Sequence, residues 1–283
     1  MSAFRNLVKP YMLWMGIFIV IPMLLIVFYA FTTEGNSVIT VKFTLDNFLK
    51  FFDSVYIKVL IKSLQIAFVT TIVCIIVGYP ISYVIANTSS KVQTLLMLLI
   101  TIPMWINTLV KTYAWISVLS DNGIVNSLLV KFGLAPINMM YTDFAVILGM
   151  VYNFLPFMIL EIYTALAKMD KGLIDASSDL GANKVQTFQK IIFPLSLSGV
   201  ISGITLVFLP SVSTFVIPKL LGGGQYMLIG NLIENQFITV GEWNFGSAIS
   251  LIMAMIILIS MYFTRKFDQD KVENGNKKEV KHA

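Results

Sequence analysis

The chain has 283 residues, of which 57% are hydrophobic and only 12% are charged, whereas about a quarter of an ordinary soluble domain is charged. Too few polar side chains are present to cover the surface of a soluble protein, so a soluble globular domain is excluded. The net charge is +5, but the sequence contains no run of five basic residues that would favour nucleic-acid binding. The single cysteine and the single histidine exclude a disulfide framework and a metal cluster of thiolates or imidazoles.

Six stretches are apolar and long enough to cross about 30 Å of hydrocarbon, which takes about 20 helical residues. We interpret them as helices, because strands of a membrane barrel would alternate polar and apolar residues. The third is continuous only if the side chain of Lys111 reaches the interface, and the fourth includes Glu161. The predicted spans are residues 10–33, 63–90, 92–119, 144–167, 191–218 and 243–264. The expected fold is therefore an all-α membrane protein with one domain of six transmembrane helices.

The distribution of basic residues predicts the orientation. Six spans place both ends of the chain on one side, together with the connection 168–190 and the charged tail 265–283. That side carries 13 of the 20 Lys and Arg residues, and basic residues concentrate on the cytoplasmic side of membrane proteins. Both termini are therefore expected in the cytoplasm.

Two outer connections have patterns of their own. In 34–62, Leu45, Phe48 and Leu49 recur at helical spacing among charged residues, which predicts an amphipathic helix that is either an interfacial cap or a docking surface. In 219–242, three consecutive glycines are not followed by Gly-Lys-Ser/Thr, and no Walker A motif occurs in the sequence. The chain is therefore not expected to hold an ATPase site or a cofactor.

The cytoplasmic connection 168–190 has two short amphipathic helical patterns separated by Gly181. Acidic residues lie in the first half and basic residues in the second, at the helix ends that favour each charge. This predicts two short helices around a glycine bend, close to the membrane. From the pattern alone, they either rest at the headgroup level or present a surface to the cytosol.

This connection contains Asp175-Ala176-Ser177-Ser178-Asp179-Leu180-Gly181-Ala182, followed by Phe188, Ile191 and Pro194. It resembles the EAA loop of ABC importer permeases, with Asp for Glu at 175 and Ser for the second Ala at 177. The resemblance implies a coupling helix seated in a groove of a separate ATP-binding subunit. The residues that it assigns to this coupling are Asp175, Ala176, Asp179, Leu180, Gly181 and Phe188.

Further segments extend the resemblance over most of the chain: Pro103-Met104-Trp105, Lys111-Thr112-Tyr113-Ala114-Trp115, 122–126, 155–158 and 221–231. They are similar to the B-type permeases of spermidine/putrescine importers, of the type I ABC importer fold, in the bacterial cytoplasmic membrane. The resemblance implies a second, homologous permease subunit, two ATP-binding subunits that hold ATP and magnesium, and an external polyamine-binding protein. The chain itself is then a transport subunit with no catalytic residue.

A polyamine carries several ammonium groups, so its path needs carboxylates, carbonyls and aromatic faces. Trp105 follows Pro103, where we expect a kink, and it lies ~20 Å into the predicted third span. Family precedent makes Trp105 the first candidate for the pathway, with Tyr113 nearby on the same span. The alternative is that these rings belong to the interfacial aromatic belt.

Acidic residues give the next candidates. Glu161 is the one acid within a predicted span and either lines the pathway or reaches the cytoplasmic interface. Asp121 stands in an outer zone with Asp143, Glu234 and Glu242, which either solvate the surface or guide cations to the mouth. Lys219 argues against a polycationic substrate, because it adds positive charge at the same mouth.

The fifth predicted span is interrupted by prolines, and a broken membrane helix is tolerated where it lines a cavity or is buried in protein. Ser211, Ser213, Thr214 and Phe215 surround the break after Pro210. The hydroxyl groups either hold ammonium groups or donate to carbonyls of their own helix.

Together these patterns predict the permease subunit of an ATP-driven importer of putrescine or spermidine. One alternative is an ABC permease for another small solute, such as thiamine, iron or an organic anion. An ATP-independent carrier or channel has no need for an EAA-like loop, and a membrane enzyme is disfavoured because no His or Asp cluster accompanies the spans.

Overall fold

The computed structural model describes residues 2–33, 42–224 and 226–282, and this part of the chain is almost entirely helical, with one isolated antiparallel bridge between Thr32 and Phe43. The long helices are Ser2–Met15 (α1), continued by π-helical Gly16–Val20 (η1) and Ile21–Ala30 (α2), then Ser54–Ala86 (α4), Ser90–Trp105 (α5), Thr108–Leu119 (α6), Asp143–Ala167 (α8), Phe193–Ser213 (α11) and Trp243–His282 (α14). Shorter helices are Asp46–Phe51 (α3), Ile124–Lys131 (α7), Lys171–Asp179 (α9), Lys184–Thr187 (α10), π-helical Phe188–Ile192 (η2), Val216–Leu221 (α12), Ile229–Asn235 (α13) and π-helical Gln236–Val240 (η3).

Five helices of the described residues are long and apolar enough to cross a membrane, and a bent pair of helices makes a sixth candidate. The bent pair is α5 and α6, whose axes differ by 95°. The structure thus agrees with six predicted spans in number, but it differs from the prediction in the shape of the third.

The third predicted span, 92–119, bends because its backbone leaves the helix after Trp105. Ile106 is extended, and Asn107 caps the next helix by accepting a hydrogen bond from the amide of Leu109 at 2.8 Å. Pro103, where a kink is expected, lies in the last turn before this break. The third span therefore turns by 95° after Trp105, so Trp105 lies at the end of the straight helix α5 and not in the middle of a straight span.

The core of the bundle is formed by α4, α8 and α11, which pack against one another. Fully buried side chains at their contact include Cys74, Met150, Met158, Ile162 and Val207. Because the inner faces are aliphatic while the outer faces are also apolar, the helices show little amphipathicity, as expected for a protein that meets lipid or other subunits on its outside.

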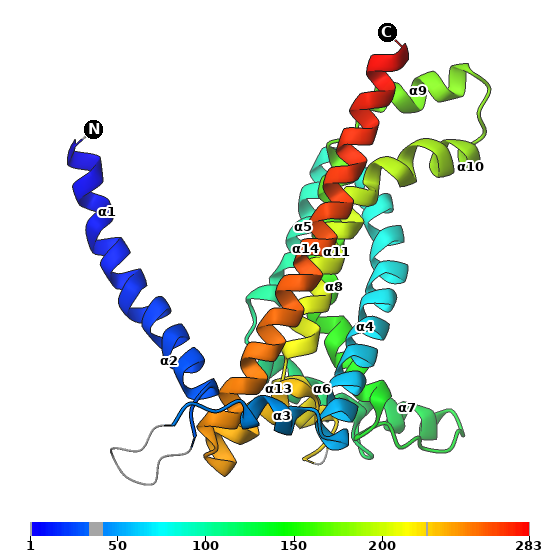
Figure 1. Cartoon of the computed structure of the whole chain (residues 1–283). Helices are drawn as coiled ribbons and strands as arrows, with labels where there is room; N and C mark the ends of the chain where they lie inside the picture. The colour runs from blue at the N-terminus through cyan, green and yellow to red at the C-terminus, as the bar shows by residue number, and fades with distance from the viewer. Residues whose placement is uncertain (1, 34–41, 225, 283) are drawn as a thin grey trace.

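The first helix stands apart from this core and meets the bundle where α2 packs against α14 (Figure 1). None of its most apolar window is buried. Its junction is fixed by amides: the side chain of Asn244 donates to the carbonyls of Tyr29 and Thr32, and that of Asn47 donates to the carbonyls of Ala30 and Thr32. The exposed helix needs a cover of lipid or of another subunit.

The molecule has two distinct ends. Both chain termini lie at the end that carries α9 and α10, and α3, α6, α7 and α13 gather at the opposite end (Figure 1). We call the first the coupling end and the second the mouth end. This arrangement matches the predicted placement of both termini beside 168–190. The helix α14 continues to His282, so the predicted tail 265–283 extends the last span as a helix over its described residues.

Candidate functional site at the two ends of the bundle

The bend of the predicted coupling loop is a helix C-cap that depends on Gly181. Gly181 has φ +82°, a conformation that other residues adopt only at a cost. The amide of Ala182 donates to the carbonyl of Ser177 at 3.0 Å, and that of Gly181 donates to the carbonyl of Ser178 at 3.0 Å. This is the Schellman pattern, which satisfies the last carbonyls of α9. The two predicted helices around a glycine bend are confirmed as α9 and α10.

A capping box orders the start of α10, and a contact between two hydroxyls joins α10 to α9. Asn183 and Gln186 form a reciprocal capping box at the start of α10, with both bonds at 2.9 Å. The hydroxyls of Ser177 and Thr187 lie 2.9 Å apart, and each side chain is 6% exposed. Ser177 is the position at which the sequence has Ser for the second Ala of the EAA pattern, and no sequence pattern connects it to Thr187.

The residues assigned to coupling divide into an exposed set and an anchor. Asp175, Ala176, Asp179 and Gly181 are exposed, and Leu180 is 88% exposed despite being apolar. Phe188 instead lies partly buried, with its ring edge-on to those of Tyr79 and Tyr83 on α4, each at 5.8 Å between centroids. The loop therefore presents an apolar tip and is anchored to the bundle through Phe188.

A cavity of about 310 Å³ separates α9 from the rest of the bundle. It is lined by Lys171, Ile174 and Asp175 of α9, and by residues of α4, α5 and α8 that include Tyr83 and Gln93. Ile174 of α9 also packs against the buried core, so α9 is held both by this contact and by its junction with α10.

The predicted pathway residues of the third span lie around the bend. Trp105 ends α5 and is 90% exposed, and Tyr113 on α6 is 57% exposed. Asp121 follows α6 and is also exposed. Glu161 lies on α8 near the coupling end and is partly buried, which leaves open both interpretations given for it.

Near the break of the fifth span, hydroxyl groups donate to their own helix. Ser211 is buried and donates to the carbonyl of Val207 at 2.6 Å, and Ser213 donates to the carbonyl of Leu209 at 3.3 Å. This is the second of the two interpretations given above for Ser211 and Ser213. Thr214 and Phe215 form the break itself, between α11 and α12.

The carbonyl of Phe215 at this break is satisfied by another outer element. It accepts a hydrogen bond at 2.8 Å from the side-chain amide of Asn231 on α13. The break also faces the third span, because α12 packs against α6. The two interrupted helices thus meet at the mouth end.

Lys111 does not reach toward an interface. Its side chain is 9% exposed, and its Nζ donates to Oδ1 of Asn153 on α8 at 2.6 Å. In place of the expected snorkelling, the ammonium group is held between α6 and α8.

Three of the four outer acids are already paired with lysines. Glu242 pairs with Lys50 at 2.7 Å, Asp143 with Lys62, and Glu234 with Lys219 at 2.6 Å. Lys219 is therefore neutralised by Glu234, which removes most of its repulsion toward a cation. Asp121 makes no ion pair with any other residue that the structure describes.

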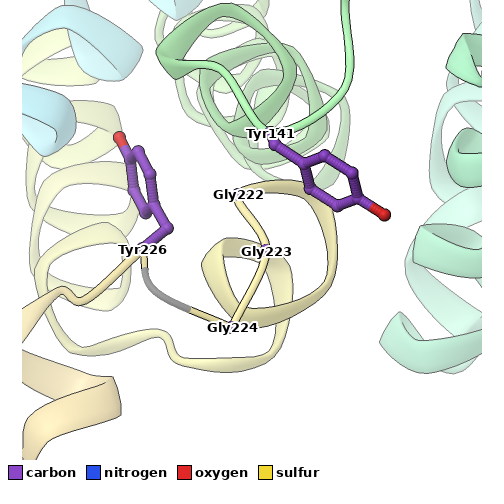
Figure 2. Close-up of a pocket in the computed structure, with 5 residues that line it drawn as sticks. All are labelled: Tyr141, Gly222, Gly223, Gly224 and Tyr226. Carbon is purple, nitrogen blue, oxygen red and sulfur yellow. The ribbon is translucent and has the colours of Figure 1, made fainter.

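A pocket of about 530 Å³ opens at the mouth end, lined by Tyr141, Gly222, Gly223, Gly224 and Tyr226. The two rings flank the glycine turn from opposite sides (Figure 2). Gly223 has φ +80°, and a Cβ there would lie 2.8 Å from the ring of Tyr141, so the turn needs glycine. The amide of Tyr141 donates to the carbonyl of Leu221 at 2.9 Å, which holds the two segments together.

The hydroxyl of Tyr226 connects this pocket to an outer ion pair by donating to Oδ1 of Asp143 at 2.7 Å. Burial, and then this hydrogen bond, raise the pKa of Tyr226 above its ordinary value. The phenol therefore stays protonated and remains a donor. Asp143 is among the outer acids expected from the sequence, whereas Tyr226 is not, because no sequence pattern connects it to Asp143.

Comparison with known proteins decides the family. Residues 78–272 match the family described as "Binding-protein-dependent transport system inner membrane component". The chain belongs to this family. It is thus a multi-pass inner-membrane transport component, an ABC importer permease that works with other ABC components.

Individual relatives cover nearly the whole permease. The spermidine/putrescine transport system permease protein PotB of Escherichia coli (strain K12) is 39% identical over 247 residues, 86% of this chain and 90% of the relative. The protein of the same name from Haemophilus influenzae (strain ATCC 51907 / DSM 11121 / KW20 / Rd) is 38% identical over 266 residues, 92% of this chain and 93% of the relative.

Solved structures show the fold of the permease. A chain of a bacterial alginate ABC transporter in complex with alginate pentasaccharide-bound periplasmic protein superposes with a TM-score of 0.78 at 16% identity, over 93% of this chain and 92% of that chain. A chain of the MetNI methionine ABC transporter, in inward-facing conformations, superposes with a TM-score of 0.58 at 16% identity, over 76% of this chain and 95% of that chain. The permease therefore has the fold of the type I ABC importer permeases.

Proposed function

We propose that this permease forms part of an ATP-driven importer of putrescine or spermidine, supplied by an external polyamine-binding protein. The observation that carries the substrate is the 38–39% identity, over most of the chain, with permeases of spermidine/putrescine transport systems. In this proposal both termini, α9 and α10 lie in the bacterial cytoplasm, and the mouth end faces outward.

The loop of α9 and α10 is the proposed contact with the ATP-binding subunits. Leu180, 88% exposed, supplies an apolar anchor for a groove, and Asp175 and Asp179 supply charge around it. ATP and magnesium are bound by the two partner subunits, because this chain lacks a phosphate-binding loop. Closure of the partners pushes the loop, and the motion passes through α10 and η2 into α11, a rigid-body change between outward-facing and inward-facing states.

A second, homologous permease completes the proposed path. The first helix is unburied along its apolar window and offers a surface for that subunit or for lipid. Trp105, Tyr113 and Phe215 supply aromatic faces near the mouth, where cation–π contacts contribute ~0.5–2 kcal/mol each. Asp121, which makes no ion pair with another described residue, supplies a carboxylate at the mouth. Glu161 supplies a second carboxylate, nearer the coupling end of α8.

The proposed function is tested by uptake of radiolabelled putrescine into proteoliposomes that contain this chain, its second permease, the ATPase and the binding protein. We expect uptake with ATP on the ATPase side and none with a non-hydrolysable analogue. ATP-independent uptake would indicate a carrier. If polyamines fail but thiamine, iron or an organic anion stimulates the ATPase, the substrate assignment is wrong and the importer architecture stands.

A further inference from the structure

The Lys62–Asp143 ion pair differs from an ordinary surface pair in what surrounds it. It joins α4 to the first residue of α8, and Tyr226, from the turn after α12, donates its hydroxyl to the same carboxylate at 2.7 Å. The Nζ of Lys62 also lies 5.9 Å from the centroid of the Tyr226 ring. One ammonium group thus meets a carboxylate and an aromatic face, the combination by which proteins bind alkylammonium ligands.

The group bound there has the chemistry of the proposed substrate. A lysine side chain is a primary ammonium on a stem of four methylene groups, which is an aminobutyl group. Putrescine is two ammonium groups joined by the same stem, and spermidine contains it at one end. The side chain of Lys62 therefore occupies its site in the way that one end of either polyamine would.

The site is accessible, and it shares Tyr226 with the neighbouring pocket. The side chains of Lys62 and Asp143 are 39% and 50% exposed. Tyr226 both bonds Asp143 and lines the pocket of about 530 Å³, whose other wall includes the exposed ring of Tyr141 (Figure 2). The three glycines between the rings leave backbone close to this space.

We propose that Asp143 and Tyr226 form an alkylammonium-binding site at the mouth, in which Lys62 is an internal stand-in that a terminal aminobutyl group of the arriving polyamine displaces. This inference rests on the proposed polyamine function and adds a receiving site to it. Displacement of Lys62 removes one link of α4 to the start of α8 and to the glycine turn, while the packed core of α4 and α8 is kept. Arrival of the substrate therefore loosens only the mouth, where these three elements meet.

The test compares Lys62→Met with Asp143→Asn in the reconstituted importer, with kcat/KM measured for putrescine-loaded binding protein. Removing the competing ammonium frees Asp143, so Lys62→Met is expected to raise kcat/KM about two- to five-fold, the size of one exposed ion pair. Removing the carboxylate charge is expected to lower it by a similar factor. The double variant is expected to behave like Asp143→Asn, and Tyr226→Phe to lower kcat/KM while keeping the ring.

If the ion pair only stabilises the structure, the result differs, because Lys62→Met and Asp143→Asn each break the pair and each should then lower kcat/KM. Lys219→Met and Glu234→Gln are the matched control, because they break the neighbouring 2.6 Å pair and make the same changes of charge without touching Asp143 or Tyr226. Each is expected to change kcat/KM less than the corresponding substitution at Lys62 or Asp143. Basal ATPase activity of each assembled complex verifies folding. If the wild type imports putrescine with ATP but Lys62→Met and Asp143→Asn both reduce it, the site is refuted and the proposed function stands. If the wild type shows no such import, both fail.

Discussion

At the scale of single residues, the coupling end depends on backbone and hydroxyl geometry more than on charge. Gly181 adopts φ +82° and closes the C-cap of α9, while the hydroxyls of Ser177 and Thr187 meet in a buried contact. The exposed acids and Leu180 act as the contact surface only if these residues hold α9 at its angle.

Replacing Gly181 by Val forces a β-branched residue into the left-handed region, at a cost of about 1–2 kcal/mol. We expect ATP-dependent uptake to fall severely while the complex still assembles, because α9 loses its cap and its angle. Uptake and ATPase activity are measured together. Gly133 has φ +76° and open space around it at the mouth end, so Gly133→Val imposes the same backbone strain far from the loop and should leave coupling intact. Equal loss in both variants would contradict the prediction.

The Ser177–Thr187 contact is tested with Ser177→Ala, Thr187→Val and the double variant. Ser177→Ala leaves the buried Thr187 hydroxyl without its partner, which costs about 1 kcal/mol. Thr187→Val should cost less, because the Ser177 hydroxyl still donates to the carbonyl of Ile174 at 2.7 Å, and the double change should cost less than the sum of the two. Thermal unfolding and transported substrate per ATP are the measurements. Ser178→Ala, on the exposed side of the same helix, serves as control. Strictly additive effects would show that the two hydroxyls do not stabilise each other.

At the scale of elements, hydropathy predicted where helices occur but not how the third span is shaped. The stretch around Ile106 and Asn107 is apolar enough to pass as continuous helix, and Pro103 indicated only a kink. The 95° turn depends on an extended residue and a side-chain cap, which hydropathy does not register. The same limit applies to Lys111, whose partner Asn153 lies 42 positions away, and to Tyr226, whose contact with Asp143 spans 83 positions.

The cap of α6 gives a prediction for this bend. Asn107→Ala removes the acceptor for the Leu109 amide and should destabilise the permease by about 1 kcal/mol, measured as a lower unfolding temperature in detergent. Asn107→Asp keeps an acceptor oxygen and is expected to retain most of the stability that Asn107→Ala loses. Unchanged stability in Asn107→Ala would show that the bend is held by packing alone.

Trp105, at the end of α5, tests the pathway at this bend. Because cation–π contacts contribute about 0.5–2 kcal/mol, Trp105→Ala should lower kcat/KM for polyamine uptake several-fold, and Trp105→Phe should retain part of it. ATPase activity without binding protein should not change. An equal loss in the Ala and Phe variants, accompanied by poor assembly, would assign Trp105 to packing instead.

At the scale of the whole molecule, the fold places α9, α10 and both termini at one end (Figure 1). The paired acids, the pocket and the breaks of the two interrupted helices lie at the other end. In the proposed importer these ends have different partners: ATP-binding subunits at the coupling end, and the binding protein with its polyamine at the mouth end. The bundle of α4, α8 and α11 connects them, so motion at one end reaches the other through packed helices.

The most direct test is thiol cross-linking in the assembled importer. The native Cys74 is buried, so Leu180→Cys, at a position 88% exposed, provides a reactive thiol at the coupling end, and Phe132→Cys, at a position 78% exposed, provides one at the mouth end. We predict that a short cross-linker joins residue 180, but not residue 132, to the ATP-binding subunit. Cross-linking of that subunit to residue 132, or to neither position, would contradict the account.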